Sequence, residues 1–598
     1  MALLCGGGLL VSGCASMPAS GEVQQVDQAP RAEGDSQVRV YGAPPKDGAQ
    51  PIEIVSGFLD ASTSEEADFR TAGQYLAASA KRTWRPLAVT NVLQERPEAE
   101  PVGLANREDP KGYTVALTGS QIATVDRAHA YTPQEKKYAQ TIHLTKENGQ
   151  WRIDRLPDGL VLGQSDFQRI YRSVNKYYFA DYHSEAGEPK AGQNVLVADP
   201  VYLRQRTDPV TASVEALLEG PTDWLHQVTA TAFPAGTVLE SGLSLDDSNA
   251  LKVPLNKHTI GADPAQCRRM AAQVFFTVQD MTRASKISEV ELQDKRGDSL
   301  CVLTQGQATT EFAPRRIAGH LAREYFIDAD QRVVSMSDTA TEPMPVPGPF
   351  GTGKTPLGSI AVAHGEDTAA GVSTDHRSLY VAPLQDGAER GAARLQSTAK
   401  SRGEDFGLSA PSWDGLGDLW VADRDAKGSR LLRLRAGQGQ PEEVAVPGLK
   451  ERRIKAIRVA ADGVRIAVLV EDKGRTTLQL GRVERGGSPR HPALSVEELR
   501  PIAPQLEDVV AASWAGGSRL VVVGTESGGV QQMQFMETDG SASSAETLPG
   551  VNGVRAVAAS EDESRPLIAD AAEGIVRLPA DANWKTVVKK GSAPVYPG

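Results

Sequence analysis

The sequence predicts a multidomain protein in which two α+β domains are followed by an all-β propeller of five or six blades. Three observations lead to this prediction: the chain length, a change from helical periodicity to short strands, and a repeat in the C-terminal half. At 598 residues the chain has room for about four domains, and its 57 glycines and 37 prolines favour many turns. Apolar residues recur at helical spacing only in the N-terminal half.

The first residues have the features of a lipoprotein signal. An apolar run ends in Ser12, Gly13 and Cys14, which are small residues followed by a cysteine. This pattern predicts signal cleavage between Gly13 and Cys14 and lipidation of the Cys14 thiol, which would anchor the protein to the outer face of the cell membrane. Because no Lys or Arg precedes Arg31, we expect the signal peptide of residues 1–13 to be truncated. The alternative is a chance apolar start with a buried cysteine.

Residues 14–50 are predicted to form the lipidated cysteine and a flexible tether. The segment is rich in Pro and Gly and has no apolar periodicity. A flexible coil of this length would extend about 30–35 Å, so the remaining domains would stand off the membrane.

Residues 51–164 are predicted to form an N-terminal α+β domain. Ile52, Val55 and Leu59 fall on one helical face after Pro51, which suits the first turn of a helix. Apolar residues at 69, 72 and 76 repeat the helical spacing. Strands are expected around residues 113–117, 139–144 and 150–156, the last of which alternates between apolar and polar residues.

Residues 165–310 are predicted to form a second, α/β domain. Val210, Val214 and Leu217 make one helical face that ends at Gly220-Pro221. A second helical stripe covers residues 270–281. Strands are expected at 176–179, 251–255 and 290–292.

Two cysteines remain once Cys5 has left with the signal and Cys14 has been lipidated. These are Cys267 and Cys301, both in the second domain. An oxidising exterior permits a disulfide between them. Two unpaired cysteines in the core are the alternative.

Residues 311–598 are predicted to form the β-propeller because short strands follow a repeated turn pattern. Glycines 415, 463 and 516 of that pattern are 48 and 53 residues apart, and weaker copies lie at 364–365 and 560–561. We expect a strand pair at 325–334 to close the ring against the C-terminal blade. The three clear copies are Ser412-Trp413-Asp414-Gly415 before 419–422, Ala461-Asp462-Gly463 before 466–469, and Ser513-Trp514-Ala515-Gly516 before 520–523.

Two motifs imitate catalytic sites, but we interpret neither as one. The segment G-P-F-G-T-G-K-T at 348–355 matches a phosphate loop, yet a Pro-rich stretch precedes it and a strand, not a helix, is expected after it. Ser397 and Lys400 match S-x-x-K, but the partner motifs of penicillin-interacting enzymes are missing. Asp423 and Asp425 are expected to cap turns. We therefore predict no catalytic residues, no metal site, no cofactor and no nucleotide, and the net charge of −12 argues against nucleic acid.

The order of these segments resembles the LpqB family of actinobacterial lipoproteins over essentially the whole chain. The motifs are V-S-G-F-L at 55–59, W-R-P at 84–86, V-E-A-L-L-E-G-P at 214–221, F-P-A-G-T at 233–237 and V-P-G-P-F-G at 346–351. The segments at 214–221 and 233–237 resemble the GerMN domain of sporulation and germination proteins.

The resemblance implies a non-enzymatic accessory of the MtrA–MtrB two-component system. Its partner would be the extracellular region of an MtrB-type histidine kinase, with effects on the cell envelope and on division. The alternative is a lipoprotein scaffold that binds peptidoglycan or another glycan. Because sugar sites usually stack pyranose rings on exposed aromatic side chains, the low aromatic content of 5% favours the protein partner.

Overall fold

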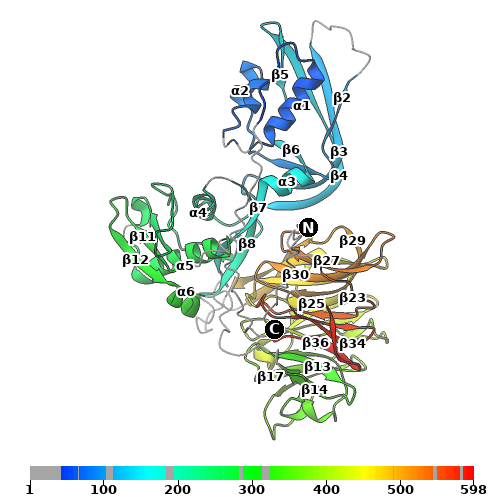
Figure 1. Cartoon of the computed structure of the whole chain (residues 1–598). Coiled ribbons are helices and arrows are strands. Elements are labelled where there is room, and N and C mark those ends of the chain that lie inside the picture. Colours follow the sequence, from blue (N-terminus) through cyan, green and yellow to red (C-terminus); the bar gives the residue numbers. More distant parts are fainter. Residues whose placement is uncertain are drawn as a thin grey trace, which may run out of the picture. The chain divides into compact units, whose positions relative to one another are not determined.

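The computed structural model describes the chain from residue 42 onward, with the gaps stated below (Figure 1). Gly13 and Cys14, the predicted cleavage and lipidation residues, lie outside the described residues. The described residues are 42–64, 66, 68–102, 112–182, 194–205, 208–259, 261–281, 287–312, 323–337, 340–488, 491–542, 548–579 and 583–598.

The N-terminal domain combines short helices with a six-stranded sheet (Figure 1). Its elements are α1 (Pro51–Ser62), a 3₁₀ turn η1 (Ala72–Tyr75), α2 (Ala78–Thr83), β1 (Thr90–Leu93), β2 (Glu98–Pro101), β3 (Tyr113–Val125), β4 (Tyr131–Glu147), β5 (Gln150–Arg155), β6 (Leu160–Gly163) and α3 (Gln164–Ile170).

Helix α1 covers the sheet, whose strand order is β5-β4-β3-β1-β6 with β2 paired to β3. The predicted helix start is confirmed, because Pro51 occupies the first turn and Val55 and Leu59 face the core. The helical prediction for 69–76 is wrong. Phe69 has a φ of +50°, in the left-handed region that interrupts a helix, and only a 3₁₀ turn follows. The apolar side chains at 69, 72 and 76 are nevertheless all buried in the core, which explains their regular spacing.

The end of the predicted tether contacts this domain. The Tyr75 hydroxyl donates a hydrogen bond to the carbonyl oxygen of Ala43 at 2.8 Å, and the Gly48 amide donates to Oε1 of Gln150 at 2.8 Å. Residues 42–50 therefore belong to the folded body.

The second domain has two three-stranded sheets with helices between them. Its elements are β7 (Tyr171–Ala180), β8 (Leu196–Arg204), α4 (Pro209–Glu219), β9 (Thr229–Ala230), β10 (Ala250–Pro254), a 3₁₀ turn η2 (Lys257–Thr259), α5 (Pro264–Met281), β11 (Glu289–Gln293), β12 (Ser299–Thr304) and α6 (Gln305–Phe312).

Helix α5 packs against β7, α4, β11 and β12, so its apolar stripe forms the centre of this core. The sheets have the orders β8-β7-β9 and β10-β11-β12. The helix predicted from Val210 ends as expected, because Gly220 has a φ of +103° that side-chain-bearing residues rarely adopt. The predicted domain boundaries, after residues 164 and 310, fall within the short helices α3 and α6. Phe167 of α3 packs in the core of the first domain and Phe312 of α6 in that of the second, so each helix belongs to the domain before the boundary.

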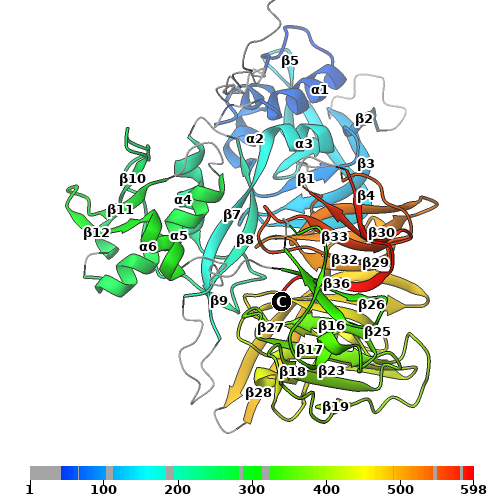
Figure 2. The same ribbon diagram turned by 60° about the horizontal axis from the view of Figure 1, so that its bottom comes forward.

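Residues 324–598 form six sheets around a ring, within the part of the chain that the structure describes (Figure 2). The prediction of five or six blades is resolved as six. Their strands are β13 (Glu324–Asp328), β14 (Val333–Met336), β15 (Met344–Pro345), β16 (Leu357–Val362), β17 (Thr368–Ser373), β18 (Ser378–Pro383), β19 (Leu395–Gln396), β20 (Gly407–Leu408), β21 (Ser412–Trp413), β22 (Leu419–Asp425), β23 (Gly428–Leu434), β24 (Glu442–Val444), β25 (Arg453–Val459), β26 (Arg465–Asp472), β27 (Arg475–Ser488), β28 (His491–Pro501), β29 (Leu506–Trp514), β30 (Arg519–Glu526), β31 (Gln531–Glu537), β32 (Ala556–Ala558), β33 (Leu567–Ala571), β34 (Gly574–Leu578), β35 (Lys585–Val588) and β36 (Gly591–Val595).

The ring closes where the sequence predicted it. Strand β36, at the C-terminal end of the chain, pairs antiparallel with β13, which also pairs with β14. The first sheet is therefore built from both ends of the propeller sequence, and it joins the last blade to the first.

The sequence repeat marks contacts between neighbouring blades. The hydroxyl oxygen of Ser412 accepts a hydrogen bond from the Val459 amide at 3.0 Å, and that of Ser513 accepts one from the Ala559 amide at 3.1 Å. In the first copy, Asp414 accepts from the indole Nε1 of Trp420 at 2.9 Å. Each of these two serines thus connects its own blade to the next one along the chain.

Candidate functional site

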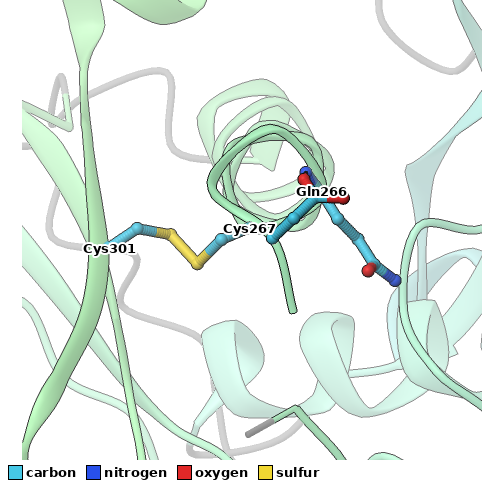
Figure 3. The surroundings of a disulfide bond; sticks show 4 residues. Gln266, Cys267 and Cys301 are labelled. Carbon is cyan, nitrogen blue, oxygen red and sulfur yellow. A yellow bond between two sulfur atoms is a disulfide. The ribbon is translucent and has the colours of Figure 1, made fainter. Parts of the chain in front are cut away.

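Cys267 and Cys301 are joined by a disulfide in the second domain (Figure 3). Cys267 lies near the start of α5 and Cys301 on β12, and their Cα atoms are 6.2 Å apart. Figure 3 shows Gln266 pointing away from the disulfide, on the other side of the helix, where its Nε2 donates to the carbonyl oxygen of Ala232 at 3.1 Å. The start of α5 is therefore held on one side by a covalent bond and on the other by a hydrogen bond.

A buried ion pair fixes the loop that follows α4. Nζ of Lys176 lies 3.6 Å from Oδ2 of Asp199, and both side chains are only 2% exposed. Lys176 also donates to the carbonyl oxygen of Gly220 at 2.8 Å. Asp199 accepts from the amide and the hydroxyl of Thr222, each at 2.8 Å. With all these groups satisfied, the loop presents Trp224 in a fixed position.

Propeller arginines surround Trp224. The guanidinium of Arg500 lies 3.9 Å from the centre of the Trp224 ring, which is a cation–π arrangement. Nη1 of Arg482 donates to the carbonyl oxygen of Trp224 at 2.5 Å and pairs with Glu498 at 3.0 Å. Blade β25–β28 is therefore in direct contact with the second domain.

A third arginine completes this contact. Arg465 forms an ion pair with Asp462 at 2.6 Å and donates to the carbonyl oxygens of Ala198 at 3.3 Å and Gly517 at 2.6 Å. The hydroxyl of Tyr182 donates to the carbonyl oxygen of Asp462 at 2.7 Å. The sequence patterns did not predict these arginine contacts. The available signal was Arg465 itself, a charged residue directly before the apolar run 466–470 of strand β26.

Buried acids lie beside the same contact. Burial raises the pKa of Glu537 to about 8 and that of Asp539 to about 6. Asp539 lines a small pocket of about 280 Å³, including space open to solvent, together with Tyr131 of the N-terminal domain, Asp199 of the second domain and Arg500 of the propeller. All three domains therefore meet at one polar, buried junction.

The phosphate-loop match is a turn of the propeller. Residues Pro349–Thr352 form a 3₁₀ turn, Phe350 packs in the core, and the predicted strand follows as β16. Gly351 leaves no room for a side chain because a Cβ atom there would collide with the carbonyl oxygen of Val346. The glycines therefore serve close backbone packing.

The S-x-x-K match is also structural. The Ser397 hydroxyl donates to Asp423 at 2.6 Å, and the amide of Lys400 donates to Asp425 at 2.9 Å. Hydrogen bonds from Ser397 and its neighbour Thr398 lower the pKa of Asp423 despite its burial, and those from the Ser401 hydroxyl and the Lys400 amide bring that of Asp425 to about 2. The two aspartates thus hold the loop 397–401 to β22, where a turn cap was predicted, because their acceptor oxygens face that loop.

No group of three or more His, Cys, Asp and Glu side chains in the described residues is placed to hold a metal ion. All Trp and Phe residues and every Tyr except Tyr41 are described, and none of these aromatic side chains is exposed.

Among the helices in the described ranges, none is both long and apolar enough to cross a membrane.

Family comparisons cover each of the three domains. A model described as "Lipoprotein LpqB, N-terminal domain" matches residues 44–168, one described as "Sporulation and spore germination" matches 176–293, and one described as "Lipoprotein LpqB beta-propeller domain" matches 331–597. Together with the fold, these matches define a multidomain propeller protein that carries a GerMN-type domain.

Whole-chain relatives give the same answer. Lipoprotein LpqB of Streptomyces avermitilis is 50% identical, covering 99% of this chain and 97% of that protein. LpqB of Streptomyces coelicolor is 45% identical, covering 100% and 97%, and LpqB of Thermobifida fusca is 28% identical, covering 99% and 97%. The chain therefore belongs to the lipoprotein LpqB family. Similarity to a chain of a nidogen/laminin complex is weak, with 10% identity and a TM-score of 0.32 over 46% of this chain and 98% of that one, and adds nothing to the assignment.

Proposed function

We propose that this lipoprotein is anchored through Cys14 to the outer face of the cell membrane and binds the extracellular sensor region of an MtrB-type histidine kinase. Binding would change MtrA–MtrB signalling and so affect the cell envelope and division. A protein that acts in this way needs no catalytic residues. A five-fold change in a kinase equilibrium requires only about 1 kcal/mol of coupling free energy.

One observation favours a protein partner over a glycan. The described aromatic residues are all buried or half-buried, whereas a pyranose stacks best on a widely exposed ring. The exposed large apolar side chains of the described residues are all aliphatic, including Val238 of the second domain and Val530 of the propeller. Protein interfaces readily use such side chains, and single ones are also ordinary on a protein surface.

The test is a binding titration with two ligands in parallel. The full chain with Cys14→Ser, which removes the lipidation site, is titrated with the purified extracellular region of the kinase and with purified peptidoglycan. Saturable binding to the kinase region alone is the expected result. Binding to peptidoglycan alone would establish the scaffold function instead, and failure to bind the kinase region would refute the proposal.

A matched pair of variants identifies the contacting domain. Val238 is 54% exposed and Val530 is 83% exposed, so Val238→Asp and Val530→Asp change the surface of one domain each without opening a core. A contact through the propeller predicts weaker kinase binding for the Val530 variant alone, and a contact through the second domain predicts the reverse. Kinase autophosphorylation measured with each variant then shows whether binding alters signalling.

A further inference from the structure

The propeller has a central channel that lies apart from its junction with the second domain. Its lining includes His364, Ser412, Arg458, Ser513, Glu561 and the C-terminal residues 594–598. Each of the six sheets contributes at least one residue to the lining, from strands β16, β21, β25, β29, β32 and β36. A cavity that touches all six sheets lies at the centre of the ring. Its volume is about 530 Å³, which includes space open to solvent.

Arg458 places a positive charge in this channel, and no ion pair within the described residues balances it. Its Nη1 donates to the carbonyl oxygen of its neighbour Ile457 at 2.9 Å, and no acidic side chain of the described residues forms an ion pair with it. Burial lowers the pKa of Arg458, because removing the guanidinium from water disfavours its charged form. By contrast, the buried guanidiniums of Arg433 and Arg577 in the same propeller each face a carboxylate.

The main chain that carries Arg458 is held firmly. Its carbonyl oxygen accepts a hydrogen bond from Nε1 of Trp514 at 3.0 Å, and the amide of the next residue, Val459, donates to Ser412. Two neighbouring blades thus hold the backbone on either side of the arginine. A fixed guanidinium loses little conformational freedom when it binds a ligand.

The uncharged groups around it can donate hydrogen bonds. The oxygens of Ser412 and Ser513 accept from backbone amides, which leaves each hydroxyl hydrogen available to donate. Burial lowers the pKa of His364 to about 4, so its imidazole is neutral at pH 7, and its Nε2 has no hydrogen-bond partner among the described residues. Glu561 is the one acidic side chain of the lining, and its Oε1 already accepts from the Ala461 amide at 3.1 Å.

We propose that the central channel binds a small organic anion, with the guanidinium of Arg458 as the counter-charge for a carboxylate or phosphate group. The planar guanidinium suits either group because it can donate two parallel hydrogen bonds. The channel walls would supply further donors from the serine hydroxyls. This site is distinct from the surface proposed to bind the kinase, so either proposal can fail without the other.

The experiment titrates the full Cys14→Ser chain with citrate, with inorganic phosphate and with chloride at matched ionic strength, using calorimetry. Saturable binding of citrate or phosphate at millimolar concentration or below is expected, and the better probe identifies the anionic group. Arg458→Gln should weaken that binding about ten-fold or more, because the charge-assisted hydrogen bonds are lost. Arg475→Gln is the control, since Arg475 is an exposed propeller arginine paired with Glu507 outside the channel.

Arg458→Lys distinguishes loss of the charge from a folding defect in the glutamine variant. The lysine keeps the positive charge but cannot form two parallel hydrogen bonds to one anionic group, so this variant should still bind the anion, more weakly than the wild type. Equal binding by the Arg458→Gln and Arg475→Gln proteins would overturn the proposal. So would equal responses to chloride and to the two anions, because that pattern indicates general screening, and so would the absence of saturable binding to the unmodified channel.

Discussion

Removing the disulfide should loosen the second domain while leaving its fold intact. Cys267 and Cys301 are 34 positions apart, so their bond closes a loop of about 35 residues in the unfolded chain. On the chain-entropy model such a loop is worth about 4 kcal/mol. Cys267 is only 4% exposed and packs in the core, so Cys267→Ala with Cys301→Ala also removes some packing. The double variant should therefore lose about 4 kcal/mol or slightly more of local stability.

The measurement has to be local because a chain of several domains does not unfold in one step. Hydrogen exchange of the amides in α5 and β11 reports opening of this domain alone. A loss of about 4 kcal/mol would accelerate exchange through complete opening of the domain by up to about a thousand-fold. Amides of the propeller strand β30 provide the internal control and should be unchanged.

The reduced wild-type protein separates the covalent bond from the packing. It keeps both cysteine side chains, so its exchange should approach that of the double alanine variant, with a remaining difference of about 1 kcal/mol from packing. Equal exchange in oxidised, reduced and double-alanine proteins would refute the reasoning. Peptide mapping under non-reducing conditions that finds only separate Cys267 and Cys301 peptides would support the alternative of two unpaired cysteines.

Three further predictions concern other parts of the chain. Burial raises the pKa of Glu537 from 4.5 to about 8, so the folded state keeps a proton that the unfolded state releases, and stability should fall as the pH rises between these values. In native-state hydrogen exchange of the β30 amides, corrected for the intrinsic pH dependence of exchange, Glu537→Gln should flatten that slope and gain a few kcal/mol at pH 8, whereas the exposed Glu526→Gln should keep the wild-type slope; two equal slopes would contradict this. Ser513→Ala should cost about 1–2 kcal/mol of local stability in the same measurement because the buried Ala559 amide loses its acceptor, and unchanged exchange would show that the hydrogen bond between the blades is not needed. Cys14→Ser should abolish metabolic labelling with a radioactive fatty acid and release the protein from membranes, and retention of the label would place the lipid elsewhere.

The propeller was largely predictable because its signal is local. Ser412, Asp414 and Trp420 lie within nine positions of one another, and each takes part in a hydrogen bond that the blade needs. The same chemistry recurs at Ser513, so the period is visible in the sequence. The number of blades was harder to predict, because the first sheet combines β13 and β36 from opposite ends of the propeller and carries no copy of the repeat.

The junction between the domains was not predictable for the opposite reason. Arg465 and Ala198 are 267 positions apart, and Arg482 and Trp224 are 258 positions apart. In both contacts the acceptor is a backbone carbonyl oxygen, which every residue has, so the acceptor leaves no mark in the sequence. An arginine in a blade strand also has a common alternative role as a partner of a carboxylate within its own blade, as Arg433 shows with Glu442. Only the fold distinguishes the two roles.

These contacts bear on how the protein could transmit a signal. The junction buries ionised side chains, and separating the domains would break their hydrogen bonds and leave the backbone acceptors in need of water. A junction of this kind resists independent motion more strongly than an interface formed by exposed ion pairs. A partner that moves the propeller would therefore move the second domain with it, because the connection between the two domains is stiff. Arg465 pairs with Asp462 while also donating to Ala198 of the second domain, so loosening either domain removes a hydrogen bond from an otherwise satisfied guanidinium. The same residue that stabilises the propeller turn thus ties it to the second domain.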